Sequence, residues 1–262
     1  MADLSAIAGF YTAEYCSQSY LIDPSVIAVS QQLGFSFNDY GDAFDGLLEN
    51  KNGKFHIYLN VKDGGHLYHP RVRFSFAHEL GHYLIAEHYR ALSDPHTKPQ
   101  PSFQTFDMDN KYEVEADYFA SCLLMPEDQL RKDFIKQKFS FVVIDEIARK
   151  YNVSVTAALL RFIGIGYHPV MIVCSRSSKI RWVRYSYDFP FTFLIGGIGS
   201  NVPEYTSAGE YFYESTKNQN KTETVFAKDW FILHNAEDRN RKFKEYCVYY
   251  EAMQQVISVL WE

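Results

Sequence analysis

One stretch of the sequence decides the fold: Arg71-Val-Arg-Phe-Ser-Phe-Ala-His-Glu-Leu-Gly-His-Tyr-Leu-Ile-Ala-Glu-His88. It contains the pattern H-E-x-x-H, from His78 to His82, inside a run that reads as helix. Residues four apart lie on one face of a helix, so the two histidines project together and can share one tetrahedral Zn²⁺ ion. Glu79 follows the first histidine, where its carboxylate can reach a water on that ion. The motif therefore predicts a zinc site with Glu79 as general base.

The residues around the motif predict a helix that is buried on two sides. Phe76, Leu80 and Leu84 form an apolar stripe roughly opposite the two histidines. Gly81 lowers the helix propensity, but its missing side chain allows a second helix to approach the metal closely. We therefore expect a helix that begins near Pro70 and packs against a partner.

His88 is one candidate for the third metal ligand. It follows His82 by six residues, the spacing of the pattern H-E-x-x-H-x-x-G-x-x-H. That pattern needs a glycine where this chain has Ile85, a β-branched residue that is poorly suited to positive φ. If the helix continues, His88 lies about 240° around from His82 and points away. We therefore expect His88 to be an ordinary histidine at a helix end.

A second predicted helix, residues 112–125, offers a carboxylate ligand. Glu113 and Asp117 are four residues apart, and two alanines fill the same face. Small residues around two carboxylates suit a helix that packs tightly against the motif helix, with one carboxylate on the metal and Asp117 hydrogen-bonded to a ligand histidine. Glu115 is rotated about 200° from Glu113, so only one of the two can face the ion. The alanine face favours Glu113, and Glu115 is the alternative.

Composition and charge limit the function classes. The chain has 262 residues, 47% of them hydrophobic and 17% aromatic, which is typical of a globular protein with one large or two modest domains. A formal net charge of −6 argues against a general nucleic-acid or anionic-membrane binder. Four widely spaced cysteines without a C-x-x-C pair suit reduced thiols, and no signal peptide or membrane span is evident. We expect a cytoplasmic protein with no membrane partner.

Periodicity and turn residues predict an α+β fold. In residues 54–60, Phe55, Ile57 and Leu59 alternate with polar or half-polar neighbours, which is the period of a half-buried strand. The other expected elements are helices at 3–17, 23–33, 127–137 and 142–164, short extended pieces at 35–37 and 43–48, a loop at 93–110, strands at 168–174 and 179–187, and a final helix after Cys247.

Several motifs together resemble the ImmA/IrrE family of zinc metallopeptidases. They are Arg73-Phe-Ser-Phe-Ala-His-Glu-Leu-Gly-His82, Glu113-Val-Glu-Ala-Asp-Tyr-Phe-Ala120, Leu123-Leu-Met-Pro126 and the helix-turn-helix-like stretch from Ile144 to Arg161. The resemblance covers roughly residues 20 to 165. It implies a gluzincin-type site in which His78, His82 and Glu113 hold one Zn²⁺ ion.

The resemblance also implies a domain plan and a substrate class. Residues 1–126 would form a zincin-like metallopeptidase domain, residues 127–164 a helical helix-turn-helix-like segment packed on it, and residues 165–262 a β-rich mixed α/β domain, either a GAF-like sensor or a simple buttress. The implied substrate is a helix-turn-helix repressor that is cleaved in a stress, phage or mobile-element response.

Zincin clefts are commonly edged by a strand that pairs with the extended substrate. Residues 54–60 are the candidate here, through Ile57, Tyr58 and Leu59. Tyr58, His66 and His69 are near enough in sequence to be considered as oxyanion donors, but we expect each to be a packing or surface residue. Arg71 and Arg73 are expected to be solvated at the helix start rather than to bind a substrate carboxylate.

The helix-turn-helix-like stretch is not expected to contact DNA. Its second helix, residues 154–163, has Arg161 as its only basic side chain, and such a helix packs better than it reads a groove. Two hypotheses for the whole chain remain. The first is an intracellular zinc endopeptidase with a narrow protein substrate. The second is a regulatory binding or sensor protein that keeps the fold with little turnover, although such a role would not require Glu79.

Overall fold

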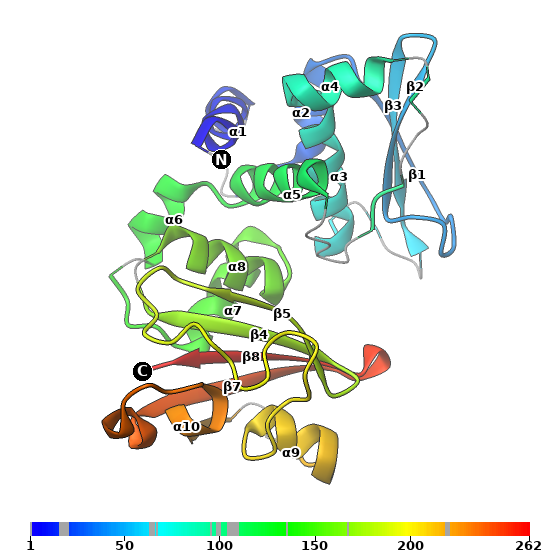
Figure 1. The fold of residues 1–262 in the computed structure, drawn as a ribbon. Coiled ribbons are helices and arrows are strands. Elements are labelled where there is room, and N and C mark those ends of the chain that lie inside the picture. Colours follow the sequence, from blue (N-terminus) through cyan, green and yellow to red (C-terminus); the bar gives the residue numbers. More distant parts are fainter. Residues whose placement is uncertain are drawn as a thin grey trace. The chain divides into compact units, whose positions relative to one another are not determined.

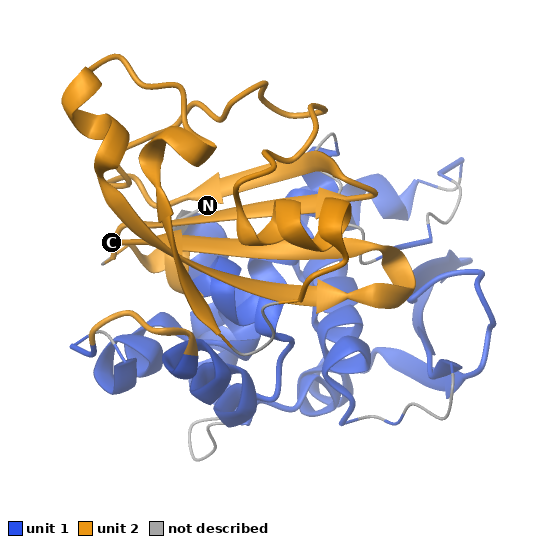
Figure 2. Cartoon of the chain, turned by 90° about the horizontal axis from the view of Figure 1, so that it is seen from below, with its two compact units in different colours: residues 1–137, 142–161 blue, residues 138–141, 162–262 orange. Residues whose placement is uncertain are grey.

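The computed structural model describes residues 2–15, 21–62, 66, 68–94, 96–97, 101–103, 110–134, 136–166, 168–217 and 221–262. It is a mixed α/β structure with two sheets (Figure 1). The chain divides into two compact units, coloured separately in Figure 2. Unit 1 comprises residues 1–137 and 142–161, and unit 2 comprises residues 138–141 and 162–262. Cys16 and much of the loop predicted at 93–110 lie outside the described residues.

Unit 1 begins with two helices and a small sheet. The helices are α1 (Ala2–Tyr15) and α2 (Pro24–Ser30), and the strands are β1 (Gly34–Asn38), β2 (Gly46–Lys51) and β3 (Lys54–Asn60). Helix α2 has proline at its first position, and the Asp23 side chain accepts a hydrogen bond from the Ser25 backbone N–H at 2.9 Å. Local capping therefore places this helix where the sequence predicts it.

Strand β3 is the central strand of the sheet, which corrects the prediction that it edges the cleft. The strand order is β1-β3-β2, with β1 parallel and β2 antiparallel to β3. Since its backbone is paired on both sides, β3 has no free edge for a peptide. Ile57 and Leu59 are fully buried, and Tyr58 points to the opposite face, where its ring meets those of His56 and Tyr40.

The helices of the motif region are α3 (Pro70–Leu84), α4 (Ala86–Ser93) and α5 (Lys111–Leu124). Helix α3 packs directly on α5 at Gly81. A Cβ atom on Gly81 would lie 3.0 Å from a Phe119 ring carbon and 3.4 Å from the Ala116 Cα atom. The missing side chain therefore lets the two helices approach closely, as the glycine in the motif predicts.

Arg73 on α3 is buried, with only 2% of its surface exposed. Its guanidinium donates hydrogen bonds to the backbone carbonyls of Tyr151 at 2.8 Å, Ile22 at 2.6 Å, and Asn152. Tyr151 is the last residue of helix α7, so the positive charge lies where unpaired carbonyls favour a cation. The prediction that Arg73 is solvated is therefore wrong, because its acceptors come from segments far away in the sequence.

Three further helices follow α5: α6 (Glu127–Phe134), α7 (Phe141–Tyr151) and α8 (Val155–Ile165). The Lys150 ammonium on α7 lies 2.7 Å from an Asp133 carboxylate oxygen on α6. Arg161 on α8 is 4% exposed, and its Nε atom donates to the Met125 carbonyl at 3.0 Å, just after the end of α5. The one basic side chain of α8 therefore ties helices together and is not presented to a partner.

Unit 2 contains a five-stranded antiparallel sheet in the order β5-β4-β8-β7-β6. Its elements in chain order are β4 (Val170–Arg176), β5 (Lys179–Tyr185), α9 (Ser207–Glu214), β6 (Thr222–Phe226), α10 (Ala227–Trp230), the 3-10 turn η2 (Ala236–Asn240), β7 (Lys242–Tyr250), the 3-10 turn η3 (Glu251–Met253) and β8 (Gln255–Trp261). Trp230, Phe231 and Phe243 lie at the centre of an apolar cluster in this unit. The helix predicted after Cys247 is wrong, because the chain forms the β7–β8 hairpin there.

Among the helices in the described part of the chain, none is both long enough and apolar enough to cross a membrane.

Candidate metal centre

Three side chains from helices α3 and α5 converge on one point. The Nε2 atoms of His78 and His82 are 3.0 Å apart. Glu113 contributes both carboxylate oxygens, at 3.1 Å from His78 Nε2 and 3.4 Å from His82 Nε2. The two histidines are one helical turn apart on α3, and Glu113 lies in the first turn of α5. The close packing at Gly81 brings these two helix faces together.

The spacing of these donor atoms fits a metal ion. Ligand atoms bound at about 2.0–2.2 Å to a tetrahedral ion are about 3.4 Å from one another, which is close to the three distances found here. Two imidazole nitrogens and a carboxylate form a donor set that commonly binds divalent transition metals. The group formed by His78, His82 and Glu113 is therefore suited to hold a metal ion with one coordination position open.

The electrostatics of this cluster favour a positive charge. Burial opposes protonation of His78, but hydrogen bonds to Asp117 and Glu113 outweigh it and raise the His78 pKa to about 10. Burial alone would raise the pKa of Glu113, but hydrogen bonds from His78 and His82 hold that pKa well below its usual range. Burial lowers the pKa of His82. The carboxylates that favour a proton on His78 would also stabilise a bound cation, because both carry positive charge.

Asp117 orients the first histidine. Its Oδ1 atom lies 2.8 Å from His78 Nδ1, the ring nitrogen that faces away from Glu113. An ionised carboxylate can only accept, so Nδ1 carries a hydrogen, and Nε2 is the nitrogen that would offer its lone pair to a metal. Asp117 is four residues after Glu113 on α5, so one helix face supplies both a candidate ligand and the group that orients another.

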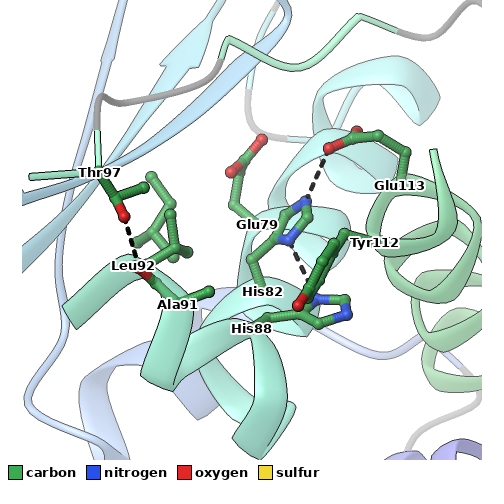
Figure 3. A pocket seen from close by; sticks show the side chains of 9 residues that line it. Glu79, His82, His88, Ala91, Leu92, Thr97, Tyr112 and Glu113 are labelled. Atoms are coloured by element: carbon green, nitrogen blue, oxygen red, sulfur yellow. Dashed lines mark hydrogen bonds and ion pairs between the residues drawn. The ribbon is translucent and has the colours of Figure 1, made fainter. Parts of the chain in front are cut away.

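His88 does not point away from His82, which corrects the geometry expected from the sequence. Helix α3 ends at Ile85, whose φ of −80° and ψ of 116° are extended, and α4 starts at the next residue. Because this break needs no positive φ, isoleucine adopts it without strain. His88 is 1% exposed, and its Nδ1 atom lies 3.1 Å from His82 Nδ1 (Figure 3). His88 therefore contacts the ring nitrogen of His82 that is remote from His78 and Glu113.

Glu115, the alternative to Glu113 in the sequence, lies behind His88. Its Oε2 atom is 3.0 Å from His88 Nε2, and its Oε1 atom is 3.5 Å from the Lys111 ammonium. The two glutamates of α5 thus have different partners: Glu113 faces both histidines of the motif, and Glu115 faces His88.

Glu79 lies beside the cluster with one oxygen unused. The residue is 1% exposed, and its Oε1 atom has no hydrogen-bond partner among the described residues. Burial raises the Glu79 pKa to about 7, although the His78 charge and the Ser102 hydroxyl act in the opposite direction. A carboxylate with a pKa near neutrality and an open oxygen can take up a proton and release it again at neutral pH.

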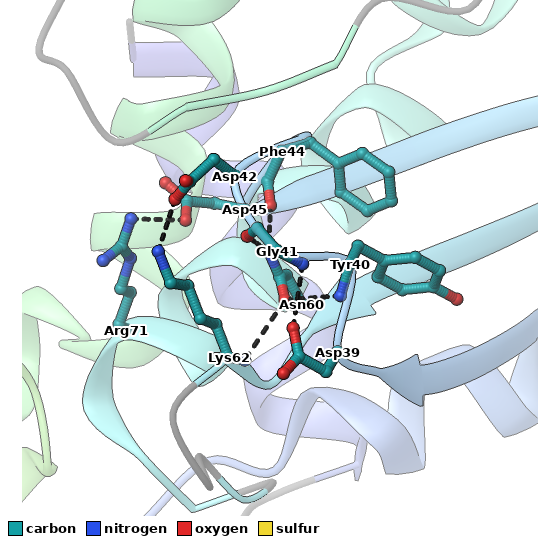
Figure 4. A network of polar contacts seen from close by, with 9 residues as sticks. All are labelled: Asp39, Tyr40, Gly41, Asp42, Phe44, Asp45, Asn60, Lys62 and Arg71. Atoms are coloured by element: carbon teal, nitrogen blue, oxygen red, sulfur yellow. Dashed lines mark hydrogen bonds and ion pairs between the residues drawn. The ribbon is translucent and has the colours of Figure 1, made fainter.

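The chain entering β2 brings backbone against Glu79. A Cβ atom on Gly46 would lie 2.6 Å from Glu79 Oε1, so only glycine leaves this carboxylate its position. The Asn60 side chain holds the preceding loop, because its amide donates to the Gly41 carbonyl at 2.8 Å and to the Phe44 carbonyl at 2.6 Å (Figure 4). A salt bridge between Asp45 and Arg71 connects the loop to the start of α3.

A small cavity of about 120 Å³ opens beside the donor group. Its polar wall includes Glu79, His82 and Glu113, which Figure 3 shows pointing into the same space. The remaining lining is largely apolar and comes from β2, α4 and the adjoining segments: Leu48, His88, Ala91, Leu92, Thr97 and Tyr112. The cavity therefore joins the donor group to a space that suits one small apolar side chain.

None of the three residues considered as oxyanion donors lines this cavity. Tyr58 is on the far face of β3, the His66 ring accepts from the Tyr68 backbone N–H at 3.2 Å, and the His69 ring caps α3 through the Arg71 N–H at 3.3 Å. The sequence did not single out Gly46, Leu48 and Ser102, because they reach Glu79 through strand pairing and loop closure and carry no motif of their own.

Comparisons with known proteins assign a family to the part of the chain that contains this site. Residues 57–162 match the family model of the IrrE N-terminal-like domain, peptidase M78. None of the curated proteins compared is similar in sequence to this chain. Among solved structures, a Mycobacterium tuberculosis transcriptional regulator is similar with a TM-score of 0.64 and 11% sequence identity, over 100% of this chain and 77% of that one. At that identity the likeness concerns the fold alone. The chain therefore carries an IrrE N-terminal-like domain of the peptidase M78 family, consistent with its resemblance to the ImmA/IrrE proteins.

Proposed function

We propose that this protein is a zinc-dependent endopeptidase. The observation that carries the proposal is the convergence of His78, His82 and Glu113 next to Glu79, whose side chain lines the same cavity and has one carboxylate oxygen without a partner among the described residues. The match to a peptidase family over the same residues supports it.

Each residue has a distinct role in the proposed reaction. His78, His82 and Glu113 would hold the zinc ion, which supplies Lewis acidity to a water and to the scissile carbonyl. Glu79 takes the proton of the attacking water on its open oxygen and passes it to the leaving amine. Burial of Glu79 suits it to both transfers, since it brings the carboxylate pKa close to the working pH.

We place the substrate along β2 rather than β3. Strand β2 is at the edge of the sheet, and its first residue, Gly46, lies against Glu79. Ser102 already forms an antiparallel bridge with Gly46: its backbone N–H donates to the Gly46 carbonyl at 2.9 Å. The outer edge of β2 thus accepts antiparallel pairing, the mode by which extended peptides add to sheets.

For the substrate we propose a helix-turn-helix repressor, on the basis of the ImmA/IrrE resemblance. The structural neighbour that is named a transcriptional regulator is consistent with a regulatory setting. We do not propose DNA as a partner, because the single basic residue of α8, Arg161, is buried against Met125.

The test uses the full chain loaded with Zn²⁺ and, as probe, a helix-turn-helix regulator from the same organism, beginning with any that is encoded beside this gene. The wild-type protein is expected to cleave the regulator at one site, and Glu79→Gln to bind the same amount of zinc without cleaving it. Equal cleavage by the variant, or no zinc in the wild-type protein, would overturn the proposal. Tight binding of the regulator by both proteins without cleavage would favour the regulatory binding role instead.

A further inference from the structure

His82 has a second contact that the proposed chemistry leaves unexplained. Its Nε2 atom faces His78 and Glu113, whereas its Nδ1 atom lies 3.1 Å from His88 Nδ1. The other nitrogen of His88 lies 3.0 Å from Glu115 Oε2. Three side chains from α3, α4 and α5 thus form one continuous row of hydrogen-bonding groups, with His88 buried in the middle.

The chemistry of the end group fixes every hydrogen in this row. Glu115 lies 3.5 Å from the Lys111 ammonium, and a glutamate beside a cation is a carboxylate at neutral pH. A carboxylate only accepts, so the hydrogen of neutral His88 is on Nε2, and His88 Nδ1 carries a lone pair. His82 Nδ1 must then be the donor in the 3.1 Å contact. The lone pair of His82 is therefore on Nε2, which is the atom that faces His78 and Glu113.

We propose that the Glu115 carboxylate acts on His82 through His88, and that this relay holds His82 in its metal-binding tautomer and orientation. His88 is a positioning residue in this arrangement and not a ligand. The inference rests on the proposed metal site. His88 and Glu115, which the sequence offered only as alternative ligands, thereby receive a positioning role, and the role of Glu115 is distinct from that of Glu113.

The fold explains why the second histidine needs a relay and the first does not. His78 meets Asp117 directly at 2.8 Å. His82 is one turn further along α3, and Glu115 projects from α5 about 200° away from Glu113, so no carboxylate of that face reaches its Nδ1 atom. The break at Ile85 turns the chain so that the His88 imidazole fills this gap.

The surroundings hold the relay in place. The Tyr112 ring packs edge-on against His88, with the ring centroids 4.6 Å apart. Lys111 lies 3.5 Å from the second oxygen of Glu115 and keeps that carboxylate charged and oriented. His88 therefore has one neighbour that fixes its ring plane and another, Glu115, that fixes its hydrogen.

The first measurement is zinc affinity of the full-length protein, by competition with a chromophoric chelator, which needs no peptidase activity. Substitution of the outer-shell partner of a metal-bound histidine typically lowers metal affinity by about 10- to 100-fold. We expect a loss of zinc affinity in this range for His88→Phe. Glu115→Leu should weaken binding in the same direction. Glu115→Gln should stay within about threefold of wild type, since an amide oxygen still accepts from His88 Nε2. The exposed His96 supplies the control, His96→Gln, with no expected change.

The second measurement reads the tautomers directly, by ¹⁵N NMR of the imidazole nitrogens in zinc-loaded wild-type protein. We expect His88 to carry its hydrogen on Nε2 and His82 to carry its hydrogen on Nδ1. In Glu115→Leu, the ¹⁵N chemical shifts of His88 should no longer show the hydrogen fixed on Nε2. The opposite tautomer of His88 would overturn the relay even if His88→Phe failed to fold, and so would unchanged zinc affinity in both His88→Phe and Glu115→Leu. Absence of zinc binding by the wild-type protein would instead overturn the proposed metal site itself.

Discussion

Among the described residues, each unit buries one carboxylate, and the two are satisfied in opposite ways. In unit 2, Glu245 on β7 is completely buried and accepts from the Ser207 backbone N–H at 3.0 Å and the Trp230 indole N–H at 3.4 Å. The Cys247 thiol approaches it at 3.5 Å. In unit 1, Glu79 is equally buried but keeps one oxygen without a partner among the described residues.

The difference separates a structural carboxylate from a reactive one. Burial raises the pKa of both groups, so burial by itself does not distinguish them. Donors on α9 and α10 surround Glu245, which therefore connects these helices to the sheet. Glu79 has one oxygen without a partner among the described residues, and its side chain lines a cavity beside the candidate metal group. A buried acid that is left partly unsatisfied is the one that is free to exchange a proton.

The largest expected effect is on Glu79 and concerns rate. Glu79→Gln should lower peptidase turnover by about 10³-fold or more, within the range of a lost general base. At pH 7.5, the metal-free Glu79→Gln variant should be at least as stable as the metal-free wild-type protein. The Glu79 pKa of about 7 in the folded state lies above that of the unfolded chain, so ionisation of Glu79 works against folding. Single-turnover kinetics and thermal unfolding measure the two quantities, and a clearly less stable variant would make Glu79 a structural acid like Glu245.

The next effect concerns stability. Glu245→Ala removes a buried side chain and leaves the Ser207 and Trp230 donors unpaired, which should lower the free energy of unfolding by about 3 kcal/mol. Zinc affinity should not change, because the contacts of Glu245 lie within unit 2. Urea denaturation and chelator competition give the two values. If Glu245→Ala is as stable as wild type, Glu245 does not connect α9 and α10 to the sheet in the way proposed here.

A smaller effect is expected at the glycine beside Glu79. A Cβ atom on Gly46 would meet Glu79 Oε1 at 2.6 Å, so Gly46→Ala should displace the carboxylate and reduce turnover by about tenfold, a value typical of a misplaced catalytic group. Zinc binding should persist, since Gly46 does not contact the donor atoms. The exposed Gly53→Ala is not an equivalent control because its φ is +80°, whereas Gly9→Ala has open space around it and should leave turnover unchanged.

The smallest effect is a pH dependence of stability from Glu245. Its folded-state pKa lies above the unfolded value near 4.5, so its protonated form contributes stability below that pH, and the contribution is lost as pH rises through the folded pKa. Glu245→Gln cannot titrate, so the stability difference between wild type and variant should shift against the wild type as pH rises from 4.5. Urea midpoints across this range report it. If the stability difference between wild type and variant stays constant with pH, the folded-state pKa of Glu245 is not raised.

Local patterns were sufficient for the elements that carry the site. The alternation in residues 54–60, the proline at position 70 and the stop at Pro126 each have a local cause, and the structure has elements with nearly the same bounds there. The tail was predicted wrongly because residues 255–261 are a short, mostly apolar run, which periodicity cannot assign to helix or strand.

Other errors arose where a distant partner decides the outcome. A strand's alternation is the same at the centre and at the edge of a sheet, so β3 could not be assigned its place between β1 and β2. Arg73 resembled a surface cation because its carbonyl acceptors are contributed by Ile22, Tyr151 and Asn152. His88 was placed wrongly because one extended residue, Ile85, rotates everything that follows it.

The sequence by itself determined which groups α3 and α5 offer, because helical periodicity fixes side chains three and four residues apart whatever surrounds them. Only the tertiary structure decided how those groups are used. It decides between the two glutamates of α5 by setting Glu113 against both histidines, shows that Asp117 meets His78 and not His82, brings His88 and Glu115 behind His82, and leaves Glu79 one oxygen without a partner among the described residues. These contacts depend on the close approach of helices at Gly81 and on the break at Ile85, and neither is encoded in the spacing of the residues that they bring together.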